Sequence, residues 1–152
     1  MAPVQQTLVL LKPDAAQRGL VGEIISRFER TGLKIVAMKL MQVDDALAHK
    51  HYGVHEGKPF FPGLVTFIAA SPIVAMVLEG PGAVDKVRSV MGPTDPIKAP
   101  PGTIRGDLGV DIGRNMVHGS DSAENAAKEV ALFFNPKELV VYKRDYDRWI
   151  IE

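Results

Sequence analysis

The sequence predicts an α/β (α+β) domain in which a small sheet is covered by helices. Apolar runs with the length of strands alternate with stretches whose apolar residues recur at helical spacing, and no repeat or low-complexity segment interrupts the order. The composition is that of a globular protein, with 46% hydrophobic and 24% charged residues. Because 152 residues is the length of one ordinary domain, we expect residues 1–152 to form a single domain.

The first elements follow from short-range patterns. Residues 8–11 form an apolar run that predicts a buried strand, ended by Pro13-Asp14. An amphipathic helix is marked by apolar residues at positions i, i+3, i+4 and i+7, namely Val21, Ile24, Ile25 and Phe28. Gly32 ends this helix, and residues 33–41 are the second strand candidate.

Two short helices are expected before the third strand. Asp44 can cap a helix through residues 47–52, and residues 60–68 form a second, apolar one. Residues 59–78 carry no charge over 20 positions, which is long enough to span a bilayer. Because prolines and glycine interrupt this run, we expect instead a buried helix, a turn and a buried strand over residues 73–78.

The second half continues the alternation. Gly80-Pro81-Gly82 turns the chain into a helix that Gly92-Pro93 ends. After a long loop, residues 116–118 form a short strand, and Asp121 and Ser122 can cap the last helix. The expected apolar stripe of that helix is Ala127, Val130, Ala131 and Phe134, and Asn135-Pro136 ends it.

The resulting order is strand, helix, strand, helical insert, strand, helix, strand, helix. The simplest fold with that order is a ferredoxin-like split βαβ, a four-stranded antiparallel sheet covered by helices, with a doubly wound fold as the alternative. The tail, residues 137–152, carries an apolar end that includes Trp149. Exposed apolar ends are costly, so we expect the tail to dock on the domain or on a neighbouring subunit.

Charge and cysteine content exclude several classes of function. Lys plus Arg equals Asp plus Glu, at 18 each, and a neutral chain does not favour nucleic acid or an anionic membrane as its main partner. There is no cysteine, which excludes disulfides and thiolate chemistry. The apolar run after the N-terminus is too short for a signal peptide, and we expect a cytoplasmic protein.

Three tempting motifs are weak. Residues 80–85 resemble a dinucleotide fingerprint, but Asp85 stands where the third glycine is needed, and residues 53–58 are one residue too short for a P-loop. His51 and His55 are four residues apart and could share a helix face as zinc ligands. No third ligand is spaced to join them, so a solvated helix end with polar side chains is the favoured interpretation.

The loop over residues 92–114 indicates phosphate binding. It spans 23 residues with five glycines and four prolines, and loops of this length are usually functional or disordered. It contains Thr94, Arg105 and Arg114, with Asn115 just after it and Arg88 on the preceding helix. Arginines gathered around one loop suit the paired hydrogen bonds that phosphate oxygens accept, although surface arginines that merely solvate the fold are an equal alternative.

His118 favours phosphate chemistry over the alternative that the arginines merely solvate the fold. It ends a short strand just before a helix N-terminus, where local amides and the helix dipole favour an anion. A neutral imidazole is a competent nucleophile at pH 7. Glu129 lies roughly two turns into the following helix and could set the tautomer of the imidazole.

Residues 115–122, Asn-Met-Val-His-Gly-Ser-Asp-Ser, resemble the active-site signature of nucleoside diphosphate kinases. The resemblance extends in order along the whole chain, through residues 7–19, 51–52, 57–64, 101–107 and 149–152. It implies a ferredoxin-like domain that transfers the γ-phosphate of a nucleoside triphosphate, typically ATP, to a nucleoside diphosphate. The route it implies is ping-pong, through a phosphohistidine at His118.

The resemblance also implies a role for each matching residue. Ser120 and Glu129 support His118, while Lys12 and Asn115 hold the ribose, and Lys12 also contacts phosphate. Tyr52 and His55 line the phosphate side, and the clamp on the phosphates consists of Arg88, Thr94 and Arg105. The base is held by Phe60, Leu64 and Ile112. The implied cofactor is Mg²⁺, bound through the nucleotide phosphates with no metal ligands from the protein.

A homo-oligomer is implied as well, and the tail and the 92–114 loop favour a hexamer over a tetramer. Stacking on Phe60 predicts broad base specificity, because every base has a π-face. Three other functions stay open on the residues alone: a regulatory protein that holds nucleotide without turnover, transfer of phosphate to histidines of other proteins, and nucleic-acid binding.

Overall fold

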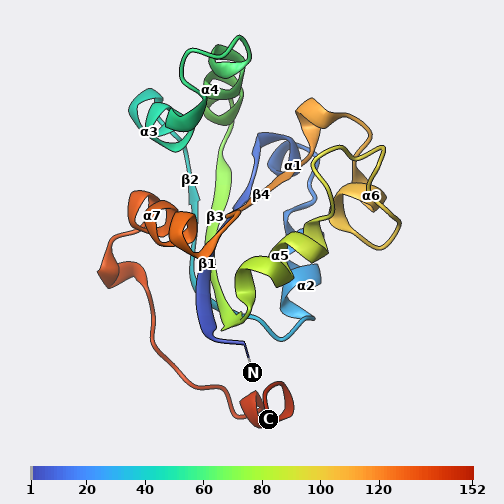
Figure 1. Ribbon diagram of the computed structural model, residues 1–152, viewed down its shortest axis with the longest axis vertical. Helices are drawn as coiled ribbons and strands as arrows, with labels where there is room; N and C mark the ends of the chain where they lie inside the picture. The colour runs from blue at the N-terminus through green and yellow to red at the C-terminus, as the bar shows by residue number, and fades with distance from the viewer. Residues whose placement is uncertain (1) are drawn as a thin grey trace.

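The computed structural model describes residues 2–152 and contains one four-stranded sheet. The strands are β1 (Val4–Leu11), β2 (Lys34–Met41), β3 (Ile73–Pro81) and β4 (Val117–Gly119). They lie in the order β2-β3-β1-β4 (Figure 1), and every neighbouring pair is antiparallel. This is the predicted ferredoxin-like split βαβ arrangement, since β3 lies between the parallel pair β1 and β2.

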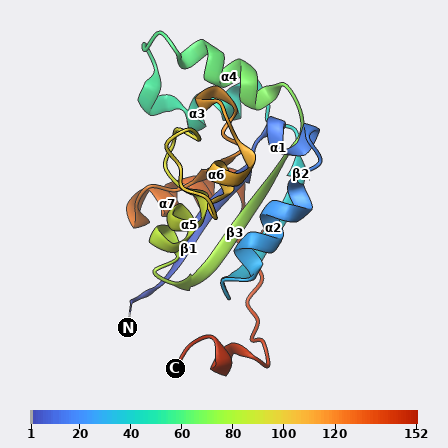
Figure 2. The same ribbon diagram turned by 90° about the vertical axis from the view of Figure 1, so that its right-hand side faces the viewer.

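Helices cover both faces of the sheet, as the two views show (Figures 1 and 2). One face packs against α3 (Asp45–His51), α4 (Phe61–Ala69) and α7 (Ala123–Phe133). The other face packs against α1 (Pro13–Gln17), α2 (Val21–Glu29), α5 (Ala83–Met91) and α6 (Ile104–Leu108). Side chains alternate along β1, so Leu8 and Leu10 enter the first core while Val9 and Leu11 enter the second.

Most elements lie where the pattern predicts them. Asp44 caps α3 by accepting from the Leu47 N–H at 2.7 Å, and Ser122 caps α7 by accepting from the Asn125 N–H at 3.1 Å. The uncharged stretch folds as α4 and β3, and within residues 2–152 no helix combines the length and apolarity that crossing a membrane requires.

Several details differ from the predictions. Helix α1 begins at Pro13, because a proline that ends a strand also fits the first position of a helix. Two strands are longer than predicted: β3 continues to Pro81, and β1 begins at Val4 rather than at residue 8. The predicted loop contains α6, whose Thr103 cap accepts from the Gly106 N–H at 3.0 Å. The stripe of α7 is shifted: Ala126, not Ala127, is buried, and Ala131 is exposed.

The tail runs along the β2 side of the domain and past the end of the sheet (Figure 1). The Val140 N–H donates to the Val36 carbonyl at 2.9 Å, and the Tyr142 hydroxyl donates to the Ile35 carbonyl at 2.6 Å. Further along, Arg144 Nη2 donates to the Gly32 carbonyl at 2.8 Å. The tail therefore docks on its own domain, although 76% of the Trp149 surface stays exposed.

We expect two glycine-to-alanine changes in helices to have opposite effects. In α6, a Cβ at Gly106 would collide with the backbone carbonyl oxygen of Pro100, so Gly106→Ala should destabilise the fold. In α2, a Cβ at Gly22 meets nothing within 4 Å, so Gly22→Ala should stabilise it by about 0.5 kcal/mol. Urea unfolding checks both. Equal midpoints for the two variants would contradict the close packing of α6.

Candidate active site

One large cavity gathers almost all the predicted site residues. It has a volume of about 1030 Å³ and opens between the α3–α4 hairpin, the 92–114 loop and α7. Of the residues to which the family resemblance assigns a role, all except Ser120 line it: Lys12, Tyr52, His55, Phe60, Leu64, Arg88, Thr94, Arg105, Ile112, Asn115, His118 and Glu129. The sheet explains this convergence, because β1 and β4 are neighbours and pair Leu10 with His118, two residues from Lys12.

His118 lies on β4 with one ring nitrogen already engaged. Its Nε2 lies 3.1 Å from Glu129 Oε1, and 26% of the His118 side chain is exposed to the cavity. Ser120 is fully buried and donates to the same Glu129 oxygen at 2.5 Å, while it accepts from the Leu8 N–H at 3.3 Å. Ser120 therefore connects β1 to Glu129 behind the histidine rather than lining the cavity.

The charge of Glu129 is maintained by these partners. Burial raises the pKa of the carboxyl, but the hydrogen bonds from His118 and Ser120 outweigh burial and lower the pKa below its ordinary value. The carboxylate thus stays ionised at neutral pH and accepts hydrogen bonds only. With Nε2–H as the donor to this carboxylate, the neutral imidazole carries its lone pair on Nδ1.

The turn that precedes His118 is strained and firmly held. Met116 has φ 67°, and it is the sole non-glycine residue among 2–152 with positive φ. Asp14 accepts from the Met116 N–H at 3.0 Å, and the Lys12 N–H donates to the Met116 carbonyl at 2.8 Å. The segment from β1 into α1 therefore fixes the segment that positions His118.

Arg105 holds the flanking carbonyls of that turn. Its guanidinium donates to the carbonyls of Asn115, Gly92 and Val117 at 3.2, 3.0 and 2.7 Å. Burial, with a smaller effect from Arg88, lowers the pKa of Arg105 to about 10. Three of the five guanidinium N–H groups are used in this way, which leaves two for a ligand in the cavity.

Lys12 presents a partly desolvated ammonium on the cavity floor. Its Nζ donates to Asn115 Oδ1, and Asn115 Nδ2 donates to the Thr94 carbonyl at 2.9 Å. Burial lowers the pKa of Lys12 to about 8, with Arg105 and Arg114 contributing and Asp14 opposing. An anionic ligand here would regain for the ammonium the stabilisation that burial removes.

The mouth of the cavity is aromatic and apolar. Phe60 is 52% exposed and Ile112 is 59% exposed, and they lie on the α3–α4 hairpin and in the 92–114 loop, respectively. The His55 ring lies 5.3 Å from Phe60 and 6.5 Å from Tyr52. Burial raises the pKa of Tyr52 to about 12, so its hydroxyl keeps its proton as a donor. A planar group can insert between such surfaces without a specific hydrogen-bond pattern.

Two sequence expectations fail at this site. Arg114 does not line the cavity, because its guanidinium stacks on Phe67 at 4.2 Å from the ring centroid. His51 is not on a solvated helix end: both of its ring nitrogens are buried. Its ring centroid lies 4.8 Å from that of His118, and burial lowers the pKa of His51 to about 3. The helical pattern alone gave no signal for this inward orientation.

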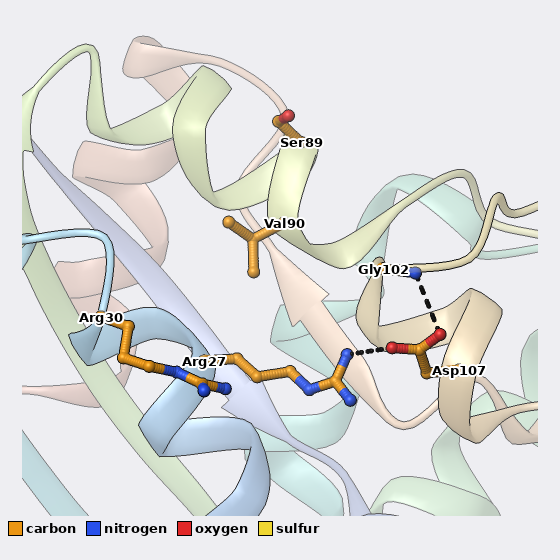
Figure 3. A pocket seen from close by; sticks show the side chains of 6 residues that line it. All are labelled: Arg27, Arg30, Ser89, Val90, Gly102 and Asp107. Carbon is orange, nitrogen blue, oxygen red and sulfur yellow. Dashed lines mark hydrogen bonds and ion pairs between the residues drawn. The ribbon is translucent and has the colours of Figure 1, made fainter.

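A smaller hollow lies outside the candidate site, between α2, α5 and the loop before α6 (Figure 3). Within it Arg27 donates to Asp107 at 2.7 Å, and Asp107 also accepts from the Gly102 N–H at 2.9 Å. None of the predicted site residues lines it. These contacts brace the 92–114 loop against α2 and thereby support Arg105 in α6.

Comparisons with known proteins give a consistent result. Residues 5–139 match the family model described as nucleoside diphosphate kinase. The curated nucleoside diphosphate kinase of Carboxydothermus hydrogenoformans is 56% identical over 149 residues, 98% of this chain and 100% of that protein. The protein of the same name from Chloroflexus aurantiacus is 57% identical over 151 residues, again 98% of this chain and 100% of that protein.

Comparison with solved structures also gives nucleoside diphosphate kinases. The halophilic nucleoside diphosphate kinase of Halobacterium salinarum, solved in complex with CDP, superposes with a TM-score of 0.96 and 51% identity, over 99% of this chain and 100% of that one. A nucleoside diphosphate kinase family protein of Babesia bovis gives 0.95 and 45% identity, over 97% of this chain and 99% of that one.

The burial of Lys12 makes the stability of the fold depend on pH. The pKa of the folded chain, about 8, lies below the ordinary 10.5, so between these pH values the unfolded chain binds more protons and stability rises with pH. At pH 7 the ammonium of Lys12 is charged and buried, which lowers the free energy of unfolding. We therefore expect Lys12→Met to stabilise the fold at pH 7 by about 1–2 kcal/mol, after allowance for partial exposure.

Urea unfolding at pH 7 and pH 10 measures this difference, which should shrink at the higher pH. Lys86→Met, on the exposed face of α5, is the matched control and should change stability by less than about 0.5 kcal/mol. A Lys12→Met variant less stable than the parent at pH 7 would show that the ammonium contributes net stability.

Proposed function

The chain belongs to the nucleoside diphosphate kinase family, and we propose that it transfers the γ-phosphate of a nucleoside triphosphate to a nucleoside diphosphate through a phosphohistidine at His118. One observation carries the mechanism: the 3.1 Å contact between His118 Nε2 and Glu129 leaves Nδ1 as the free nitrogen at the cavity. The enzyme class itself rests on full-length relatives that are more than half identical.

The chemistry divides into two equivalent steps. The Nδ1 lone pair attacks the γ-phosphorus, the bond to the β–γ bridging oxygen breaks, and the diphosphate leaves with that electron pair. Positive charge develops on the imidazole, and the Glu129 carboxylate stabilises it through the Nε2–H hydrogen bond. A second diphosphate then attacks the phosphohistidine by the reverse path, which regenerates neutral His118.

The cations of the cavity neutralise the phosphates. Phosphoryl transfer depends mainly on positioning and on charge stabilisation. We assign the phosphate clamp to Lys12, Arg88, Arg105 and Thr94, with the Tyr52 hydroxyl and His55 on the same side. Because burial destabilises the ammonium of Lys12 and the guanidinium of Arg105, both gain from a phosphate anion.

The rest of the nucleotide fits the outer cavity. Phe60 and Leu64 on the hairpin and Ile112 across the mouth offer apolar surface for the base, and this surface accepts any base. Lys12 and Asn115 are assigned to the ribose hydroxyls. Broad specificity for the base is therefore part of the proposal.

Magnesium belongs to the substrate in this proposal. The cluster of potential metal ligands in the cavity consists of His51, His118 and Glu129, and two imidazoles with one carboxylate do not suit Mg²⁺, which prefers oxygen ligands. The cation therefore enters on the nucleotide phosphates, where it screens their charge.

The mass of the intact protein tests the covalent route. After incubation with ATP and Mg²⁺ we expect one added phosphate, stable to base, lost in acid and discharged by either GDP or UDP. His118→Ala should gain none. Nucleotide binding without any added phosphate would contradict the proposal and favour a regulatory protein that holds nucleotide without turnover.

We also propose that the chain forms a homo-oligomer, a hexamer rather than a tetramer, and that residues 1–152 act as one domain within it. Exposed apolar side chains support an assembly: Leu40 on β2 and Ile97 in the loop are each 73% exposed, and Val141 and Trp149 in the tail are 100% and 76% exposed. Surfaces of this kind mark contacts with a partner.

Trp149 is the only tryptophan, so its fluorescence reports on the assembly. We expect sedimentation velocity to give a hexamer, and dilution to subunits to shift the emission to longer wavelength as Trp149 becomes solvated. Trp149→Ala should sediment as a smaller species. A monomer at micromolar concentration would contradict the proposed assembly.

A further inference from the structure

His51 lines the cavity, has no task in the proposed mechanism, and carries two polar atoms that are buried. It ends α3 with its ring packed edge-on against Phe133 and His118, at centroid distances of 5.2 and 4.8 Å. Both ring nitrogens are buried, and neither has a hydrogen-bond partner among residues 2–152. A buried polar atom without a partner is costly, and such atoms indicate strain or a role with a ligand.

The neighbours of His51 supply two further ligand atoms. His51, His118 and Glu129 each present one nitrogen or oxygen, and these atoms lie within 4.8 Å of one another. In a tetrahedral zinc site with bonds of about 2.0–2.1 Å, neighbouring ligand atoms are roughly 3.3 Å apart. His118 Nε2 and Glu129 Oε1 already stand at 3.1 Å. The ligand atom of His51 therefore has to move closer to the other two by at most about 1.5 Å, which small side-chain rotations can supply.

We propose that His51, His118 and Glu129 form a site for a divalent transition metal of the zinc class, and that metal binding there stops phosphoryl transfer. Two histidines and one carboxylate are a donor set used by catalytic zinc sites, which keep a fourth position open. The inhibitory part of this inference rests on the proposed function of His118, whereas the binding part does not.

The inhibition follows from the two nitrogens of one imidazole. Neutral His118 carries one proton and one lone pair, and the proton lies on Nε2 towards Glu129. A metal on Nε2 displaces that proton to Nδ1, where it occupies the lone pair that attacks phosphorus. A metal on Nδ1 occupies that lone pair directly. In both cases the ring keeps its proton, and no nucleophile remains.

Other charges in the cavity limit the affinity. Glu129 is the one anion of the ligand set, while Lys12 and Arg105 place cations in the same cavity. We therefore expect a reversible site that a chelator such as EDTA empties. Mg²⁺ should not compete at millimolar concentration, because the nitrogen donors disfavour it.

Titration with Co²⁺, a spectroscopic substitute for Zn²⁺, tests binding without any nucleotide. We expect one equivalent to bind the parent with the visible bands of a four-coordinate nitrogen–oxygen site, and Zn²⁺ to displace it. His51→Phe keeps an aromatic ring against Phe133 and removes both nitrogens, so it should bind at least tenfold more weakly. The matched control is His49→Asn, because His49 and Asp45 form an exposed pair at 3.4 Å on the same helix.

Equal Co²⁺ affinity in the parent and His51→Phe would overturn the site, as would loss of binding in His49→Asn. Circular dichroism and thermal unfolding without metal verify that His51→Phe is folded, and Glu129→Gln, which removes the anionic ligand, tests the same site independently. The second readout is phosphohistidine formation with Mg²⁺ and ATP. Zn²⁺ should suppress it in the parent at least tenfold more strongly than in His51→Phe, each relative to its own rate without Zn²⁺.

Discussion

The backbone of Met116 is the constraint on which the rest of the site depends. A residue with a side chain and φ 67° occupies a conformation that costs of the order of 1–3 kcal/mol. That cost is offset from three sides, by the Asp14 carboxylate, the Lys12 amide and the Arg105 guanidinium. The strained turn directs Asn115 towards Lys12 and leaves His118, two residues later, on β4 facing the cavity. The three groups that fix the turn come from two distant parts of the chain.

The same arrangement explains why single residues serve both structure and chemistry. Arg105 holds backbone carbonyls with three N–H groups, and it also lines the cavity. Ser120 binds the Leu8 amide and the Glu129 carboxylate, so the position of the acid that supports His118 depends on the core strand. A change at either residue is expected to affect both stability and turnover, because no separate scaffold supports them.

Local patterns predict much of this fold, and they fail where one residue type has two uses. The strands and long helices follow from period and capping, as Asp44 and Ser122 illustrate. Pro13 predicts the end of a strand, although it also begins α1, and the glycines and prolines of the 92–114 loop leave no helical pattern for α6. Spacing along α3 could not show that His51 faces His118, because that contact joins segments 67 residues apart and depends on how α3 packs over the sheet. The roles of the site residues came from the family resemblance, since pairing of β1 with β4 cannot be deduced from either strand alone.

The pairing of β1 with β4 has a consequence for synthesis of the chain. Leu10 and His118 are partners across more than a hundred residues, and contacts of such long sequence separation form late because loop closure must come first. A nascent chain that has emerged only as far as α5 holds Lys12 without the strand that carries His118. With His118 in its proposed role, a chain that ends with α5 lacks the nucleophile and cannot transfer phosphate from a nucleoside triphosphate.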